Sequence, residues 1–341
     1  MFSPAWALLL EFVLVGLCAI GLFATLGLVL VLMERKVAAY MQIRLGPNRV
    51  GPKGMFQSLA DTVKLMMKEG LTPDGADKFL FNMAPYVVII TSMLLLAPIA
   101  FAKNFQAWDL NIGVLFVTAV SSISVIGILM AGWASNNKYS LLGAMRSGAQ
   151  IVSYELSAGL SILSVIVLTG SLQVTDIIAS QQNGWWIFKG HIPIIISFII
   201  FIIAVTAETN RAPFDMAEAE SELTAGFHTE YSGMKFALFF LAEYINIFIA
   251  CAIGSTLFFG GWMPFHIGHW EGFNHIMDYI PSSVWFFGKT FALIFLIMWF
   301  RWTFPRLRVD QLLNLEWKYL LPISMINLLI ATLVAIQGWY L

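Results

Sequence analysis

The chain has 341 residues, of which 59% are hydrophobic and only 11% are charged, whereas about 25% of the residues in a soluble domain are charged. A water-soluble fold of this size would leave much of its apolar surface open to solvent, so the composition indicates an integral membrane protein. The 19 basic and 20 acidic residues give a net charge of −1, which lacks the basic excess that nucleic-acid binding requires.

Eight apolar segments are long enough to cross about 30 Å of hydrocarbon as helices. Gly and Pro are scattered through them, and none shows the alternation typical of a barrel strand. The fold class predicted is all-α: a polytopic membrane protein whose residues 1–341 form a single transmembrane domain with additional amphipathic helices. The predicted spans lie near 6–33, 79–102, 112–134, 153–173, 190–208, 236–259, 283–301 and 319–339.

Basic residues gather in the loops that follow the odd-numbered spans. These loops hold 16 of the 19 Lys and Arg residues, and Lys103, Lys189 and Lys289 lie on the other side. By the positive-inside rule, these loops face the cytoplasm and both termini face outward. We expect a multi-pass protein of a bacterial inner membrane rather than of a mitochondrial one.

The first large loop, residues 34–78, contains a turn and a predicted helix. The turn has the sequence GPNRVGP over 46–52, whose Gly and Pro residues restrict the backbone. From Phe56 to Lys68 the apolar residues share one helical face, which predicts an amphipathic helix at the membrane surface. A helix packed on the ends of its own bundle would show the same pattern, and both interpretations hold if the helix walls a crevice between lipid and protein.

The loop between the fifth and sixth spans is unusually acidic. On a helix, Asp215, Glu218 and Glu222 would share one face, and Glu220 would point elsewhere. Helix capping by Asp215 and Glu218 explains two of these acids. Capping does not explain Glu220, Glu222 and Glu230, whose like charges would repel one another. Acids packed so closely raise one another's pKa and can hold shared protons near neutral pH.

Two acids, Glu155 and Glu243, lie inside predicted spans, and Glu208 ends the fifth. Acids within the membrane are costly unless they are paired or hydrated, and they mark proton or ion paths more often than structural pairs. We therefore predict a polar track from the cytoplasmic surface toward the middle of the membrane.

Metal ligation is not favoured by the sequence. Cys18 and Cys251 are isolated in apolar runs without a CxxC motif, which favours two buried thiols over zinc or iron–sulfur ligands. The outward loop contains a small cluster that fits a solvated loop better than a metal site: His266, His269, Glu271 and His275. We expect no metal ion in this chain.

Several long motifs resemble a known family. They are GPNRVG (46–51), GMFQSLADTVK (54–64), NNKYSLLGAMR (136–146), SYE (153–155), PFDMAEAESE (213–222) and EYSGMKF (230–236). Together they are similar to the membrane heel subunit of respiratory complex I, which is the H subunit of bacterial NADH-quinone oxidoreductase and chain 1 in mitochondria. The similarity runs from the first span to the last, and the segment 262–282 is the part without a match.

The resemblance implies a membrane subunit of a proton-pumping NADH:quinone oxidoreductase. Such a subunit forms most of a chamber that ubiquinone or menaquinone enters from the bilayer as substrate, and it has no redox centre of its own. NAD, FMN and iron–sulfur clusters belong to other subunits. The implied partners are the quinone-site subunits of the hydrophilic arm and small membrane subunits that adjoin the antiporter-like chain.

The resemblance also implies roles for individual residues. The quinone chamber and its entrance would comprise Glu34, Arg35, Arg44, Arg49, Phe56, Asp61, Lys64 and Arg211. A proton-coupling chain would comprise Glu155, Glu208, Asp215, Glu218, Glu220, Glu222, Glu230 and Glu243.

Two alternative functions fit parts of the sequence. One is the membrane subunit of a related membrane-bound hydrogenase or formate hydrogenlyase. The intact GPNRVG turn and the surface helix favour a quinone chamber over this alternative. The other is a stand-alone proton-coupled secondary transporter. Internal repeats are not evident in the sequence, and the large loops fit a protein partner, so both features count against a transporter.

Overall fold

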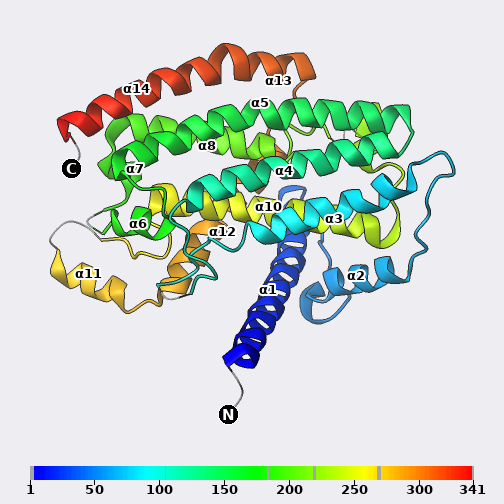
Figure 1. Ribbon diagram of the computed structural model, residues 1–341, viewed down its shortest axis with the longest axis horizontal. Coiled ribbons are helices and arrows are strands. Elements are labelled where there is room, and N and C mark those ends of the chain that lie inside the picture. Colours follow the sequence, from blue (N-terminus) through cyan, green and yellow to red (C-terminus); the bar gives the residue numbers. More distant parts are fainter. Residues whose placement is uncertain (1–3, 104, 183, 218–219, 267–269, 340–341) are drawn as a thin grey trace.

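The structure is a computed structural model that describes residues 4–339 except 104, 183, 218–219 and 267–269, and within that range it does not describe the side chains of 4–9, 11–12, 220–221 and 271. Long helices lie side by side along the long axis of the molecule (Figure 1). Within the described residues, β pairing is limited to one isolated bridge between Ala102 and Phe105. The predicted all-α polytopic fold is confirmed.

Seven of the described helical stretches are long and apolar enough to cross a membrane. They are α1 (Pro4–Met41), α4 (Gly113–Ala134), α5 (Lys138–Thr169), α8 (His191–Glu208), α10 (Gly233–Phe259), α12 (Ser282–Thr303) and the stretch from α13 (Val309–Leu315) through the π turn Glu316–Leu320 to α14 (Leu321–Gln337). The remaining predicted span corresponds to the shorter apolar helix α3 (Lys78–Leu94).

Short elements connect these helices. They are the 3₁₀ turn η1 (Pro52–Gly54), α2 (Gln57–Met67), α6 (Val174–Ala179), α7 (Trp186–Lys189), α9 (Glu220–Leu223), the 3₁₀ turn η2 (Gly226–His228) and α11 (Glu271–Asp278). Helix α2 is the predicted surface helix, and its apolar side chains, such as Leu59 and Met67, are exposed.

Helix ends differ from the predicted span limits where polar sequence continues a helix. Helix α1 runs to Met41, so Glu34 and Arg35 lie on the same helix as the first span. Helix α5 begins at Lys138, where the Asn137 side chain accepts a hydrogen bond from the Tyr139 amide, and it therefore includes the polar stretch before the predicted fourth span. The second span is predicted to reach residue 102, but α3 ends at Leu94 and turns follow.

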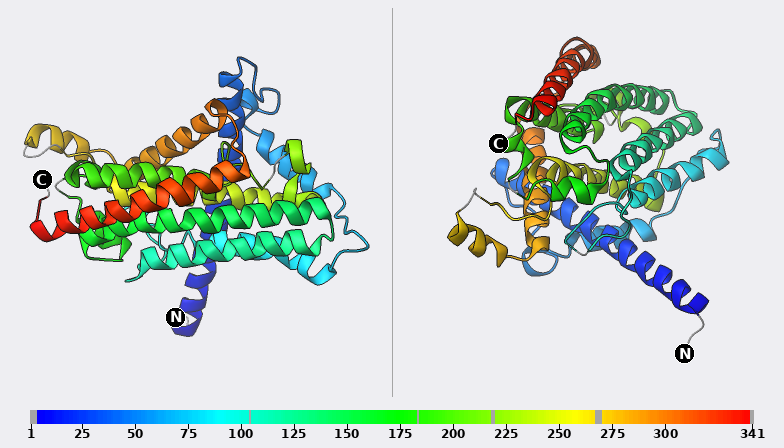
Figure 2. Two further views of the ribbon diagram at one scale, coloured as in Figure 1. Left: turned by 90° about the horizontal axis from the view of Figure 1, so that it is seen from above. Right: turned by 60° about the vertical axis from the view of Figure 1, so that its left-hand side comes forward.

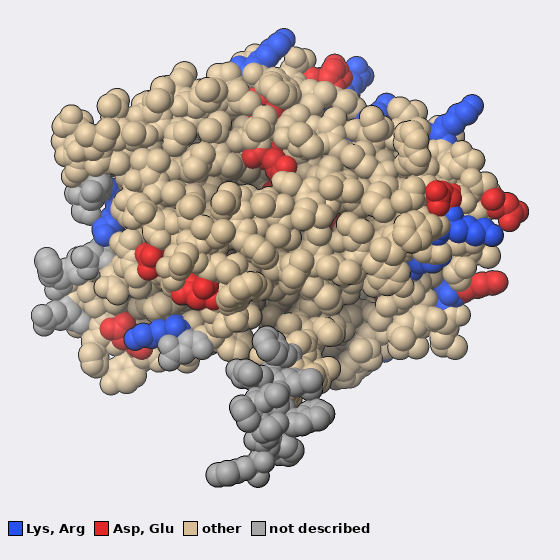
Figure 3. Space-filling model, in the orientation of Figure 1, with Lys and Arg blue, Asp and Glu red and all other residues tan. Residues whose placement is uncertain are grey.

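Helix α10 is the central element of the bundle. It packs against α1, α3, α8 and α12, while α5 packs against α4, α8 and α14. Two of these helices, α1 and α12, cross the bundle obliquely (Figure 2). Most charged side chains on the face shown in Figure 3 lie toward its two ends and along its upper edge, and the largely uncharged surface between them contains one acidic patch in its upper middle.

Close contact between α4 and α5 depends on Gly132. A Cβ atom at this position would lie 2.2 Å from the Ala144 Cβ and 2.9 Å from the Ser140 carbonyl oxygen. We expect Gly132→Ala to destabilise the protein by about 1–3 kcal/mol because two backbones must separate. Thermal unfolding in detergent measures this effect, and Gly288→Ala is the control because nothing lies within 4 Å of its Cβ position. Equal melting temperatures for the two variants would contradict the packing argument.

Candidate functional site

Four charged side chains from four segments form a buried ion cluster, defined here as Glu34, Arg211, Glu243 and Arg301. The Glu34 carboxylate pairs with Arg301 and lies 3.4 Å from Nη1 of Arg211. The Nε atom of Arg211 lies 3.4 Å from the Glu243 carboxylate. Only 5% of the Arg211 side chain and 7% of the Glu34 side chain are exposed, so these charges have little contact with water.

The cluster balances two carboxylates with two guanidinium groups. The Arg211 guanidinium also lies 4.5 Å from the ring centroid of Tyr244, which adds a cation–π contact. Buried charges interact strongly because the surrounding medium has a low dielectric constant. A new charge nearby therefore changes which groups of such a cluster are protonated. The sequence-based prediction separates Glu34 and Arg211 from Glu243, whereas the structure brings all three together.

A lateral cavity of about 520 Å³ lies between α4, α5, α8 and α10. Its lining is mostly apolar, but Glu155 and Glu208 both contribute to it. The Ser122 hydroxyl donates a 2.7 Å hydrogen bond to the Glu155 carboxylate. Glu155, predicted to lie inside a span, and Glu208, at the end of the next span, therefore share one cavity, and a hydroxyl group contacts Glu155.

A second, smaller cavity shares lining residues with the lateral cavity, and Glu243 of the ion cluster also lines it. This junction cavity has a volume of about 40 Å³, and both Glu208 and Glu243 line it. Glu208 and Asn246 line both cavities, and the Ser92 hydroxyl donates a 2.8 Å hydrogen bond to the Asn246 side chain. The carboxyl groups of Glu155, Glu208 and Glu243 therefore lie along two neighbouring cavities, and Glu243 in turn contacts Arg211.

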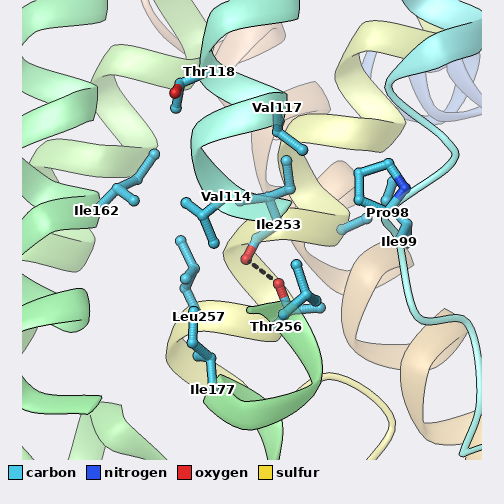
Figure 4. A pocket seen from close by; sticks show the side chains of 12 residues that line it. Pro98, Ile99, Val114, Val117, Thr118, Ile162, Ile177, Ile253, Thr256 and Leu257 are labelled. Atoms are coloured by element: carbon cyan, nitrogen blue, oxygen red, sulfur yellow. Dashed lines mark hydrogen bonds between the residues drawn. The ribbon is translucent and has the colours of Figure 1, made fainter. Parts of the chain in front are cut away.

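Beyond the lateral cavity, toward α6, the surroundings become apolar. A cavity of only about 20 Å³ is lined there by side chains such as Val114, Ile177 and Leu257 (Figure 4). The hydrogen bond drawn in Figure 4 joins the Thr256 hydroxyl to the Ile253 carbonyl oxygen within one helix. Among the residues lining this cavity none is charged, so the carboxyl groups do not continue through it.

The acidic loop is organised by turns rather than by the helix expected from its sequence. Residues 211–217 form turns, and the described helix α9 begins only at Glu220, so a helix that starts at Asp215 is wrong. One oxygen of Asp215 is buried without a hydrogen-bond partner among the described atoms. Glu218 and the side chain of Glu220 lie outside the described residues.

The other two loop acids bind to the start of α5. Glu222 pairs with Nη1 of Arg146 at 2.8 Å, and the Asn137 amide donates a 2.6 Å hydrogen bond to Glu230. Glu230 also lines an open cavity of about 350 Å³ between Pro73 and Tyr139. These acids therefore lie at the loop surface and outside both buried cavities.

The residues predicted for the quinone entrance lie around the end of α1 and on α2. Arg35 of α1 forms an ion pair with Asp61 of α2, and the Gln57 amide donates to the same carboxylate at 3.3 Å. Phe56, 55% exposed, precedes α2. The three basic residues predicted for the entrance, Arg44, Arg49 and Lys64, are exposed. The Nε atom of Arg44 donates a 2.7 Å hydrogen bond to the Gln42 side chain.

Two charged residues of interest were absent from the predicted site. Arg301 completes the ion cluster, and its only sequence signal is a basic residue at the end of a span. Glu316 is fully buried in the π turn, where the Ser157 hydroxyl of α5 donates to it and its second oxygen has no partner among the described atoms. A buried acid next to Trp317 is hard to distinguish from an interfacial acid by sequence.

The histidines of the loop before and within α11 do not form a metal site in the described residues. His266 pairs with Asp278 at 2.9 Å, and His269 and the Glu271 side chain lie outside the described part of the chain. Groups of three or more His, Cys, Asp or Glu side chains able to hold a metal are not found among the described residues.

His228 gives a pH-dependent prediction. It lies in η2 against the rings of Phe227 and Phe236, and burial lowers the pKa of His228 from 6.5 to about 4. A base with a lower pKa in the folded state binds fewer protons there than in the unfolded state. Its contribution to stability is therefore present above pH 6.5 and is lost as the pH falls toward 4.

We expect His228→Gln to remove this part of the acid sensitivity. Melting temperatures of wild type and variant, measured between about pH 7 and about pH 4, should fall less steeply for the variant. Parallel pH profiles would show that His228 is not a source of acid sensitivity.

The comparisons with known proteins agree on one family. A family model described as NADH dehydrogenase matches residues 13–332. A protein of Bacteroides fragilis is 58% identical over 332 residues, which are 97% of this chain and 93% of the relative. A protein of Bacteroides thetaiotaomicron is 57% identical over 98% of this chain and 94% of its own length, and one of Bacillus cytotoxicus is 47% identical over 95% and 94%. All three are named as the H subunit of NADH-quinone oxidoreductase.

Proposed function

The chain belongs to the family of the H subunit of NADH-quinone oxidoreductase, and from this premise we propose that it walls a quinone chamber and couples quinone reduction to proton movement through a chain of carboxyl groups. As a family member, the chain is a membrane subunit of this enzyme complex, and other complex I subunits are its partners. Full-length similarity to relatives so named supports this function over a hydrogenase subunit or a stand-alone transporter.

The observation that carries the proposal is the continuity of the buried carboxyl groups. Glu208 lines two cavities, one of which it shares with Glu155 and the other with Glu243. Arg211 connects Glu243 to Glu34, which lies on α1 next to Arg35. The proposed quinone entrance and the lateral cavity are thus the two ends of one series of ionisable groups.

Electrostatics gives a mechanism for the coupling. Negative charge that appears on quinone during its reduction makes proton uptake by nearby carboxylates more favourable. In the proposed mechanism, Glu34 and Arg211 respond to this charge first, and the proton distribution over Glu243, Glu208 and Glu155 changes in turn. The quinone supplies the redox chemistry, while this chain holds and moves protons.

The proposed series ends laterally. The small cavity beyond it is lined by uncharged residues, which supports a shift of protons within this chain toward a neighbouring membrane subunit. We infer that this neighbour is one of the small subunits next to the antiporter-like chain. The loop acids Asp215, Glu218, Glu220, Glu222 and Glu230 would adjoin the hydrophilic arm.

The remaining assignments are also proposals. Quinone is the substrate that this chain would help to bind, and NAD, FMN and iron–sulfur clusters would be held by other subunits. A bacterial inner membrane is the proposed location, with the loops that contain α2 and α9 on the cytoplasmic side and both termini outside.

The proposed entrance is tested by photolabelling. A photoreactive quinone analogue, added to the intact complex, should label residues of α1 and of the segment from η1 to α2, and excess quinone should compete. Labelling confined to other subunits would contradict the assignment of this chain to the chamber.

Substitutions at Arg49 and Gly54 distinguish an effect on quinone contact from an effect on folding of the same turn. Arg49 is exposed, so Arg49→Ala should leave the protein folded but lower the apparent quinone affinity by about tenfold through lost contacts, equivalent to about 1.4 kcal/mol. Gly54 has φ +76°, and a Cβ there would lie 2.1 Å from the Pro47 carbonyl oxygen, so Gly54→Ala should reduce assembly itself. Unchanged quinone kinetics in Arg49→Ala would assign this side chain no functional contact.

A further inference from the structure

Helix α11 (Glu271–Asp278), which follows α10 and precedes α12 in the chain, lies outside the bundle, near the end of the molecule that also holds α6, α7 and the C-terminus (Figures 1 and 2). At 100° per residue, the apolar side chains from Trp270 to Ile280 share one face of this segment, while His275 and Asp278 share the other. The proposed chamber and carboxyl series do not involve this helix.

The apolar face of α11 is exposed. Trp270 is 64% exposed and Ile276 is 63% exposed, and the aromatic ring of Phe273 stacks on that of Trp270 at 5.6 Å. A stacked aromatic pair and a β-branched side chain on one open face form an apolar surface that water solvates poorly.

Two contacts attach α11 to the rest of the protein. His266 binds Asp278 at 2.9 Å, and the Trp285 indole N–H of α12 donates to the Met277 carbonyl oxygen at 3.4 Å. These contacts hold the helix in place, and they leave both Ile276 on the apolar face and His275 on the polar face exposed.

The tether to α12 keeps α11 close to the membrane boundary. Three residues separate Asp278 from Ser282, which allows an extended length of about 10–14 Å between the two helices. Val284, in the first turn of α12, is 54% exposed and belongs to a membrane-spanning helix. The open face of α11 therefore lies beside a surface that already faces lipid.

We propose that α11 is an interfacial helix whose Trp270–Ile280 face binds the lipid bilayer at the boundary between headgroups and acyl chains. Trp and Tyr side chains favour this boundary, and the exposed Tyr279 fits it as well. The sequence from 262 to 288 contains no Lys or Arg, so binding depends on apolar burial and not on anionic lipid. The helix anchors the outer end of α12 to the membrane surface.

Site-specific quenching tests this inference in the intact complex. Ile276→Cys places a thiol on the apolar face, and His275→Cys is the matched control on the polar face; Cys18 and Cys251 are replaced by Ala in both. Each thiol receives an environment-sensitive fluorophore, and the complex is reconstituted into phosphatidylcholine vesicles. Brominated acyl chains report lipid contact, and iodide reports water contact.

We expect brominated lipid to quench the fluorophore at position 276 several-fold more than at 275, and iodide to show the reverse order. Adding anionic lipid should leave this contrast unchanged. Iodide quenching at both positions would show a helix in water, and protection of position 276 from both quenchers would show that a protein covers it; either result overturns the proposal. Retained NADH:quinone activity in both variants would show that the complex is intact, independently of the coupling mechanism.

Discussion

Replacing Arg211 with methionine is expected to lower NADH:quinone activity by about tenfold or more and to reduce the amount of assembled complex. The substitution removes the cation that lies 3.4 Å from both Glu34 and Glu243, and only 5% of the Arg211 side chain is exposed. Breaking a buried ion pair by removing one partner costs about 3–5 kcal/mol because a carboxylate stays behind in a poorly solvated site.

The matched control is Lys78→Met, which removes an exposed basic residue at the start of α3. An exposed substitution of this kind changes stability by at most about 0.5 kcal/mol. Assembly is measured by native gel electrophoresis, and quinone reduction is divided by NADH oxidation with a hydrophilic acceptor that bypasses the quinone. If Arg211→Met and Lys78→Met behave alike in both assays, the ion cluster has neither a structural nor a functional role.

The second large effect is expected at Glu155. Glu155→Gln keeps the shape of the side chain and a partner for the Ser122 hydroxyl, but it cannot exchange a proton. We expect normal assembly and a quinone-reduction rate lower by about 100-fold or more, because a positioned proton-transfer group typically contributes about 10²- to 10⁴-fold. Ser122→Ala should have a smaller effect, because it removes a hydrogen bond and leaves the carboxyl group.

Asp109→Asn serves as the control for Glu155→Gln. Asp109 accepts hydrogen bonds from Gln173 and Thr175 in an exposed loop, and it lines neither the lateral cavity nor the junction cavity. Its variant should retain the wild-type rate. Full activity and proton pumping in Glu155→Gln would exclude this residue from the coupling path.

The structure also explains which parts of the site the sequence predicts well. Glu155 and Glu243 stand out because an acid inside an apolar span has few structural explanations. Likewise, the amphipathic period from Phe56 to Lys68 predicts α2 with only small errors at its ends. In both examples the physical cause is local, so one segment contains the whole signal.

Features that depend on several helices were not predicted. The ion cluster joins α1, α10, α12 and the turn after α8. Arg301 and Glu34 lie far apart in the sequence, and no sequence pattern indicates that they form a pair. The helix at Asp215 was predicted from a capping pattern, but turns continue to residue 217. The buried Glu316 depends on a π turn and on Ser157 of another helix.

The orientation of the exposed faces is a third property that depends on tertiary structure. Sequence shows that α11 has an apolar side, but only the exposed fractions of Trp270 and Ile276 show that the rest of the chain leaves these side chains uncovered. The same holds for the lateral cavity, which exists because α4, α5, α8 and α10 leave space around Glu155 and Glu208.

Redox-induced infrared difference spectroscopy of the purified complex tests the central claim most directly. The account predicts that reduction of quinone changes the C=O stretching band of protonated carboxyl groups, and that Glu155→Gln removes part of this change while the signals of the quinone itself remain. A difference spectrum identical in wild type and Glu155→Gln would contradict the claim that the carboxyl series responds to the quinone.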